Sequence, residues 1–73
     1  MKTQNTIELK SYTSYSRCVN DLIKQGCKDL GWLNDGIKIP KGNYIEVYEN
    51  HYDNESVYLD KDLKVFCSVN TSD

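Results

Sequence analysis

The clearest pattern of apolar and polar positions along the chain is helical and covers residues 15–30. Apolar side chains recur there at spacings of three, one and three residues, and only polar or charged residues lie between them. The members of this stripe are Tyr15, Cys18, Val19, Leu22, Ile23, Gly26, Cys27 and Leu30. Because one face of a helix repeats every ~3.6 residues, the pattern predicts an amphipathic helix over residues 14–30 with this stripe against the core.

Residues that commonly start or stop a helix lie at both ends of the predicted one. Residues 11–14 contain hydroxyl side chains, whose oxygens can accept the free backbone N–H groups of a first helical turn. Gly26 and Gly31 are the two candidate stops, because glycine readily adopts the left-handed conformation found just after many helices. We expect the helix to continue past Gly26 and to end at Gly31.

Shorter segments alternate between apolar and polar side chains, which is typical of strands with one buried face. The predicted strands are residues 6–10, 37–39, 44–50, 57–60 and 65–69. We expect the core face of the two central strands to carry Ile45, Val47, Val57 and Leu59. The pattern therefore predicts an α+β fold, a small two-layer domain in which one amphipathic helix packs on a three- or four-stranded, mainly antiparallel sheet in the order β-α-β-β-β.

Length and composition narrow the class of protein further. The chain has 73 residues and a net charge of −2, which indicates a single domain over residues 1–73 and argues against a strongly basic nucleic-acid binder. No apolar run approaches the ~18 residues of a membrane span, and no secretory signal is recognisable. The odd number of cysteines (Cys18, Cys27 and Cys67) favours reduced, buried thiols, so we expect a cytoplasmic protein.

Residues that could support catalysis or metal binding are few. His51 is the only histidine and lies in a polar loop, and the four glycines are too scattered for a phosphate-binding loop. A zinc site usually needs four ligands in close pairs, and the acidic turns lack the spacing of an EF-hand. We therefore expect no enzymatic activity, no cofactor and no metal.

Part of the second half of the chain resembles a βγ-crystallin Greek-key motif. The matching residues are 33–35, 37–42, 47–50, Tyr52 and Ser56. The resemblance implies an all-β Greek-key fold as an alternative to the α+β fold, and calcium binding as in many members of that family. Asn54 stands where the family's hairpin has glycine, and the serine pair that follows Asn-Asp is absent, so no calcium ligands are assigned.

Charge is distributed unevenly along the chain. Residues 1–41 carry seven basic and four acidic side chains, whereas residues 42–73 carry two basic and seven acidic ones. The acidic half is also rich in tyrosine. Strand alternation places a set of tyrosines and carboxylates on the side of the sheet opposite the helix, or in the hairpin loop, and we expect this set to bind a partner. Its members are Tyr44, Glu46, Tyr48, Tyr52, Tyr58 and Asp60.

This acidic, tyrosine-rich face favours a small non-catalytic protein that binds another protein through a basic surface. Tyrosine combines a stiff apolar ring with a polar tip, and carboxylates steer a basic partner. The target could be a surface that normally holds nucleic acid, as for an inhibitor from a phage or mobile element. Alternative functions are a nucleic-acid-binding module that stacks bases on its aromatic face, and a calcium-binding Greek-key domain.

Overall fold

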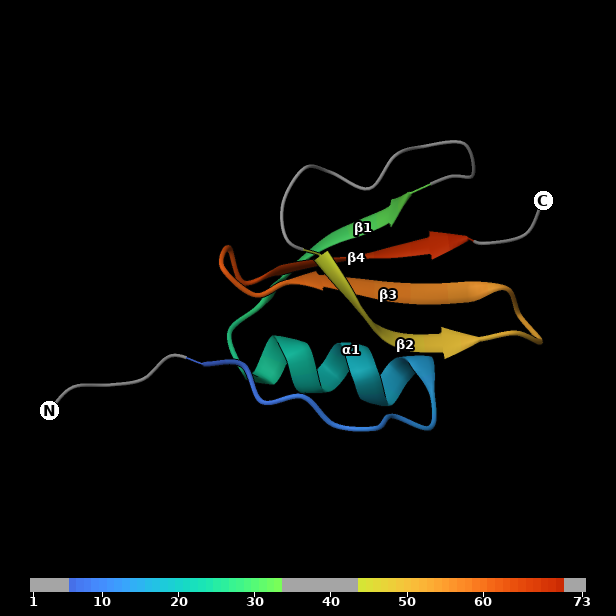
Figure 1. Ribbon diagram of the computed structural model, residues 1–73, viewed down its shortest axis with the longest axis horizontal. Coiled ribbons are helices and arrows are strands. Elements are labelled where there is room, and N and C mark those ends of the chain that lie inside the picture. Colours follow the sequence, from blue (N-terminus) through green and yellow to red (C-terminus); the bar gives the residue numbers. More distant parts are fainter. Residues whose placement is uncertain (1–5, 34–43, 71–73) are drawn as a thin grey trace, which may run out of the picture.

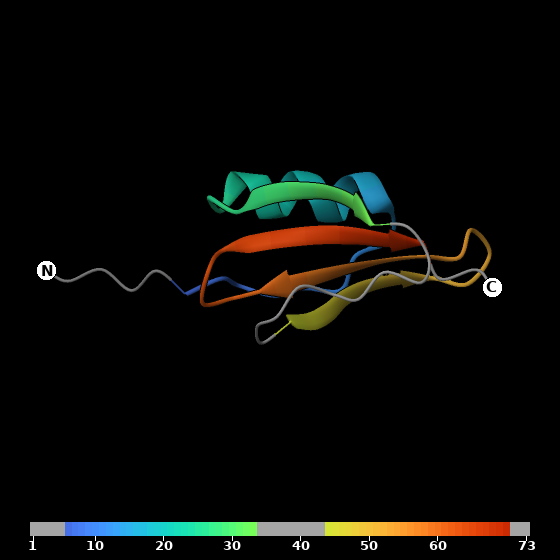
Figure 2. The ribbon, with the colours of Figure 1, turned by 90° about the horizontal axis from the view of Figure 1, so that it is seen from above.

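The structure is a computed structural model that describes residues 6–33 and 44–70, which form one helix and a four-stranded mixed sheet (Figure 1). The elements are α1 (Tyr15–Lys24), β1 (Lys28–Leu33), β2 (Tyr44–Asn50), β3 (Glu55–Asp60) and β4 (Val65–Asn70). Figures 1 and 2 together place α1 against one face of the sheet. The predicted α+β class is confirmed, whereas the predicted β-α-β-β-β order is not, because the helix precedes all four strands.

The spatial order of the strands is β1-β4-β3-β2. Strands β2, β3 and β4 form an antiparallel meander, joined by the turns at residues 51–54 and 61–64. Strand β1 joins the far side of β4 and runs parallel to it, so the sheet is mixed. The all-β Greek-key alternative is not confirmed: its features at residues 34–43, including the predicted strand at 37–39, lie outside the described residues.

Helix α1 begins where the sequence predicts and ends earlier. The Ser14 hydroxyl accepts a hydrogen bond from the Arg17 N–H at 3.2 Å and caps the first turn. At the other end Gly26 has φ +95°, and its N–H donates to the Ile23 carbonyl at 2.9 Å. The Cys27 N–H donates to the Leu22 carbonyl at 2.9 Å, which completes a Schellman motif. The expectation that the helix passes Gly26 is therefore wrong.

The last part of the predicted helix is strand β1. Its residue Leu30 is 42% exposed rather than buried, and Ile23 at the end of α1 is 50% exposed. Gly31 also has positive φ, +91°, but within β1, where the pairing register with β4 shifts between Asp29 and Trp32. The helical spacing beyond Gly26 is thus coincidental. This segment is extended, and its backbone N–H and C=O groups form hydrogen bonds with β4.

The predicted first strand at residues 6–10 is not a strand. This segment instead runs beside α1, where the Gln25 side-chain amide donates to the Glu8 carbonyl at 2.9 Å and accepts from the Glu8 N–H at 2.7 Å. One side-chain amide therefore provides both of the backbone bonds that a neighbouring strand would provide. Ile7 is buried as its place in the alternation predicts, whereas Leu9 is 41% exposed.

The core lies between α1, the segment before it and the inner face of the sheet. It consists of Ile7, Cys18, Leu22, Cys27, Val57, Leu59 and Phe66. All three cysteines are free and buried, which confirms that part of the prediction. Within residues 6–33 and 44–70, no helix is long and apolar enough to cross a membrane.

Candidate functional site

A β-bulge at Val47 decides which face each residue of β2 presents. Glu46 pairs with Tyr58, whereas Tyr48 pairs with Val57, so Val47 is the extra residue. Consecutive residues of β3 point to opposite faces of the sheet, and paired residues share a face. Glu46 and Tyr48 therefore lie on opposite faces, although an unbroken alternation would place them on the same one.

Tyr48 consequently lies on the helix side of the sheet. It packs against the core, and its ring contacts that of Tyr15 edge-to-face, with the ring centroids 6.5 Å apart. The prediction that Tyr48 shares a face with Tyr44 and Tyr58 is wrong. The physical reason is that the extra residue in β2 reverses the alternation from that point onward.

The same bulge brings a different carboxylate to the outer face, the side of the sheet opposite α1. Glu49 pairs with Ser56, which shares the outer face with Tyr58, so Glu49 joins Glu46 there. Tyr44 lies on this face as well, because it pairs with Asp60. We call Tyr44, Glu46, Glu49 and Tyr58 the acidic outer face. Period-two alternation excludes Glu49 from this set, and the sequence around Val47 carries no glycine that would indicate a bulge.

The electrostatics of the acidic outer face keep its tyrosines protonated. Burial raises the pKa of Tyr58, and the charge of Glu46, hydrogen bonding to Glu46 and the charge of Glu49 raise it further. Burial is also the main cause that raises the pKa of Tyr44. Glu46 and Glu49 are exposed. The face thus presents two hydrated carboxylates beside half-buried phenols that remain neutral hydrogen-bond donors at physiological pH.

Asp60 has a structural role that alternation does not reveal. It is 1% exposed, and its Oδ1 accepts hydrogen bonds from the backbone N–H groups of Asp62 at 3.0 Å and Leu63 at 3.3 Å. This burial does not fit the expectation that Asp60 contributes to a partner-binding set. The carboxylate shapes the turn between β3 and β4 and is not available to a partner.

Tyr52 is the most exposed aromatic residue among those described, at 97%. It projects from the turn between β2 and β3, which the Asn50 side chain orders. Asn50 Oδ1 accepts from the N–H groups of Tyr52 at 2.9 Å and Asp53 at 3.2 Å, and its Nδ2 donates to Asp53 Oδ2 at 3.0 Å. A well-defined turn therefore holds a fully exposed ring next to acidic side chains.

No protein-family model, curated protein or solved structure matches this chain.

The cysteines and the histidine lie in different environments: the thiols are buried and the imidazole is exposed. Burial raises the pKa of the Cys18 thiol to about 12 and also raises the pKa values of Cys27 and Cys67, so all three remain neutral thiols. His51 is exposed, and its Nε2 lies 3.3 Å from a carboxylate oxygen of Glu49. No group of three metal-ligating side chains occurs within residues 6–33 and 44–70.

A second aromatic group lies on the helix side of the sheet. Tyr15 and Trp32 stack with ring centroids 5.4 Å apart, and the Tyr15 hydroxyl lies 2.7 Å from Ser68 Oγ. Trp32 is 51% exposed. The helical stripe places Tyr15 in the helix, and no pattern in the sequence indicates that Trp32 lies beside it.

Proposed function

We propose that this chain is a non-catalytic protein-binding domain whose acidic outer face, together with Tyr52, docks on a basic surface of another protein. The observation that carries the proposal is the bulge at Val47. It gathers Glu46 and Glu49 on one side of the sheet, beside the half-buried phenol of Tyr58. Carboxylates and tyrosines in this arrangement suit a partner with exposed lysine and arginine.

The separation of the two carboxylates fits a row of cations. Glu46 and Glu49 pair with Tyr58 and Ser56, which are two residues apart on β3, and a strand rises about 3.3 Å per residue, so the two glutamate backbones are roughly 7 Å apart. A protein surface that holds a nucleic-acid backbone presents lysines and arginines along its length. Occupation of such a surface by this domain would block nucleic-acid binding, which is how a small inhibitor would act.

The tyrosines supply the apolar part of the contact. Tyr52 is almost fully exposed and is held by the Asn50 turn, so its burial in a partner pocket would remove a large ring from water at little conformational cost. Tyrosines of this kind commonly dominate the binding energy of an interface. We expect the carboxylates to control the rate of association and Tyr52 to control the lifetime of the complex.

Affinity capture with matched variants tests this proposal. The immobilised chain is exposed to a lysate of the cells that produce it, and Glu46→Lys is compared with Glu8→Lys. Both substitutions change the net charge by the same amount, and both glutamates are exposed, but Glu8 lies on the segment beside α1. We expect a protein that is retained by the wild type and by Glu8→Lys but lost with Glu46→Lys.

The captured protein is then measured in purified form. Tyr52→Ala should weaken its binding by about 1–3 kcal/mol, roughly 5- to 150-fold, as expected for an aromatic anchor. Single-stranded nucleic acid should compete with the wild-type chain for it. If every protein retained by the wild type is also retained by Glu46→Lys, the acidic outer face is not an interface and the proposal fails.

A further inference from the structure

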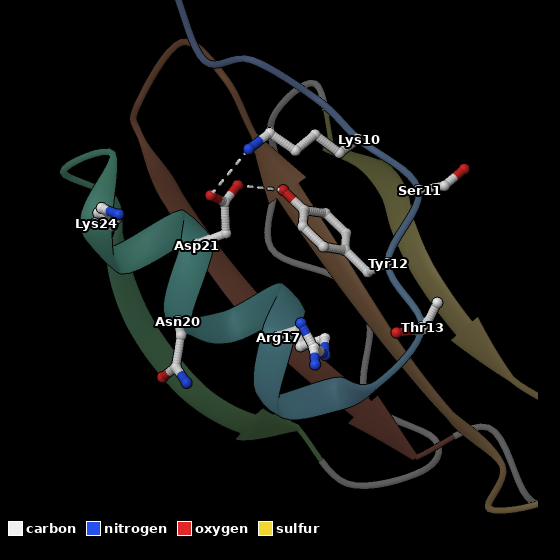
Figure 3. Close-up of a pocket in the computed structure, with 8 residues that line it drawn as sticks. All are labelled: Lys10, Ser11, Tyr12, Thr13, Arg17, Asn20, Asp21 and Lys24. Carbon is white, nitrogen blue, oxygen red and sulfur yellow. Dashed lines mark hydrogen bonds and ion pairs between the residues drawn. The ribbon is translucent and has the colours of Figure 1, made fainter.

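An open pocket lies between α1 and the segment that precedes it, on the side of the molecule that bears the helix (Figure 3). Its volume is about 540 Å³, which falls in the range of small-molecule sites. One wall is formed by successive turns of the helix and the other by the chain before it. The lining residues are Lys10, Ser11, Tyr12, Thr13, Arg17, Asn20, Asp21 and Lys24.

The pocket is built on one carboxylate that already has its partners. Asp21 Oδ2 accepts from the Tyr12 hydroxyl at 2.5 Å and from the Gln25 amide at 2.8 Å, and Asp21 Oδ1 lies 3.6 Å from Lys10 Nζ (Figure 3). These contacts fasten the Lys10 and Tyr12 side chains to the helix. The hydrogen bond from Tyr12 is the largest cause that lowers the pKa of Asp21, so the carboxylate remains charged and offsets Lys10.

Two cations of the lining have no such partner. Arg17 and Lys24 form no ion pair within the described part of the chain, and both are exposed at the pocket. Because Asp21 is the only carboxylate among the lining residues, the lining carries a net charge of +2 from three cations and one anion. The Ser11 and Thr13 hydroxyls and the Asn20 amide can donate hydrogen bonds to oxygen atoms of a ligand, whereas the Tyr12 hydroxyl already donates to Asp21.

We propose that this pocket binds a small ligand with several phosphate groups, held between Arg17 and Lys24. These residues are seven positions apart on α1, so the helix rise of 1.5 Å per residue separates their backbones by roughly 10 Å. Asn20 lies between them. Both side chains are long and exposed, and a chain of phosphates offers oxygen atoms to both cations along this length. Arginine also recognises phosphate oxygens in a bidentate manner.

The pocket adjoins the acidic outer face: neither Glu46 nor Glu49 lines it, but a smaller hollow next to it is lined by both glutamates and by Lys10, Ser11 and Tyr12. Arg17 and Lys24 do not line that hollow, so the phosphate site and the protein-binding face rest on different residues and either proposal can fail without the other. A nucleoside di- or triphosphate and a free polyphosphate share the recognised chemistry. The Tyr12 ring in the lining provides apolar surface for the remainder of a nucleotide.

Titration of the isotope-labelled chain with tripolyphosphate, followed by NMR at low salt, tests the proposal. We expect saturable shifts in the backbone amides of residues 10–13 and 17–24, and at least fivefold weaker binding of orthophosphate. Lys24→Gln and Arg17→Gln should each weaken the binding of tripolyphosphate at least fivefold. Lys61→Gln is the matched control, because Lys61 is an exposed lysine in the turn between β3 and β4, and it should leave the affinity unchanged.

Three results would overturn the proposal: no saturable shift at millimolar tripolyphosphate, shifts spread over every lysine-bearing surface, or equal weakening by Lys61→Gln and Lys24→Gln. Circular dichroism of each variant verifies that it is folded. A further titration with a nucleoside triphosphate distinguishes the two sources. If the nucleoside triphosphate binds more tightly than tripolyphosphate, the ligand is a nucleotide. If the two bind equally, the phosphate chain alone is recognised.

Discussion

Replacement of Tyr48 by alanine tests the bulge in β2 through the stability of the free protein. Tyr48 is half-buried, packs against the core and contacts the Tyr15 ring with centroids 6.5 Å apart. Truncation of a fully buried aromatic side chain costs about 3–5 kcal/mol, so half burial scales this to about 2 kcal/mol. Loss of the ring pair adds about 0.5–1 kcal/mol. We therefore expect Tyr48→Ala to lower the free energy of unfolding by about 2–3 kcal/mol.

Urea denaturation followed by circular dichroism provides the measurement. Tyr52→Ala is the matched control, because Tyr52 is 97% exposed and its loss should change the free energy of unfolding by less than about 0.5 kcal/mol. Tyr48→Phe should remain close to the wild type, since the Tyr48 hydroxyl has no hydrogen bond to the described residues. If Tyr48→Ala were as mild as Tyr52→Ala, Tyr48 would face solvent and β2 would alternate without a bulge.

Three further predictions concern stability and thiol chemistry. Gly26→Ala should destabilise the fold by about 1–2 kcal/mol in urea, because φ is +95° there while no atom would contact the added Cβ. The hydrogen bond from Tyr12 lowers the pKa of Asp21, so the stability that this carboxylate contributes should be lost as the pH falls through that lowered pKa. The difference in the free energy of unfolding between the wild type and Tyr12→Phe should therefore narrow below about pH 4. A difference that stays constant with pH would contradict this coupling. Thiol labelling of Cys67 should be slow in the native protein and complete in denaturant, whereas rapid native labelling would contradict its burial.

Local signals in the sequence predict the parts of the fold that depend on local interactions. The Ser14 cap, the helical stripe up to Gln25 and the three strands of the meander follow from side-chain periodicity and capping chemistry. The end of the helix is ambiguous, because Gly26 and Gly31 both adopt positive φ, one after a helix and one inside a strand. Only the pairing of β1 with β4, which are distant in sequence, distinguishes them.

The candidate sites depend still more on contacts that periodicity does not contain. Alternation correctly separates Glu46 from the core, but a single extra residue in β2 exchanges Tyr48 for Glu49 on the acidic outer face. The basic pocket requires the Gln25 amide to hold residues 6–10 beside the helix. Residues 6–10 have the pattern of a strand, so the sequence alone does not bring Lys10 next to Asp21.

Both edge strands of the described sheet, β1 and β2, contain an irregularity in their pairing: one between Asp29 and Trp32, the other at Val47. A flat, regular edge offers its unpaired N–H and C=O groups to any other extended chain, which leads to aggregation. A bulge twists the strand locally and interrupts that row of groups. The feature that sets the faces of β2 therefore also protects this small sheet from growing by the addition of strands from other molecules.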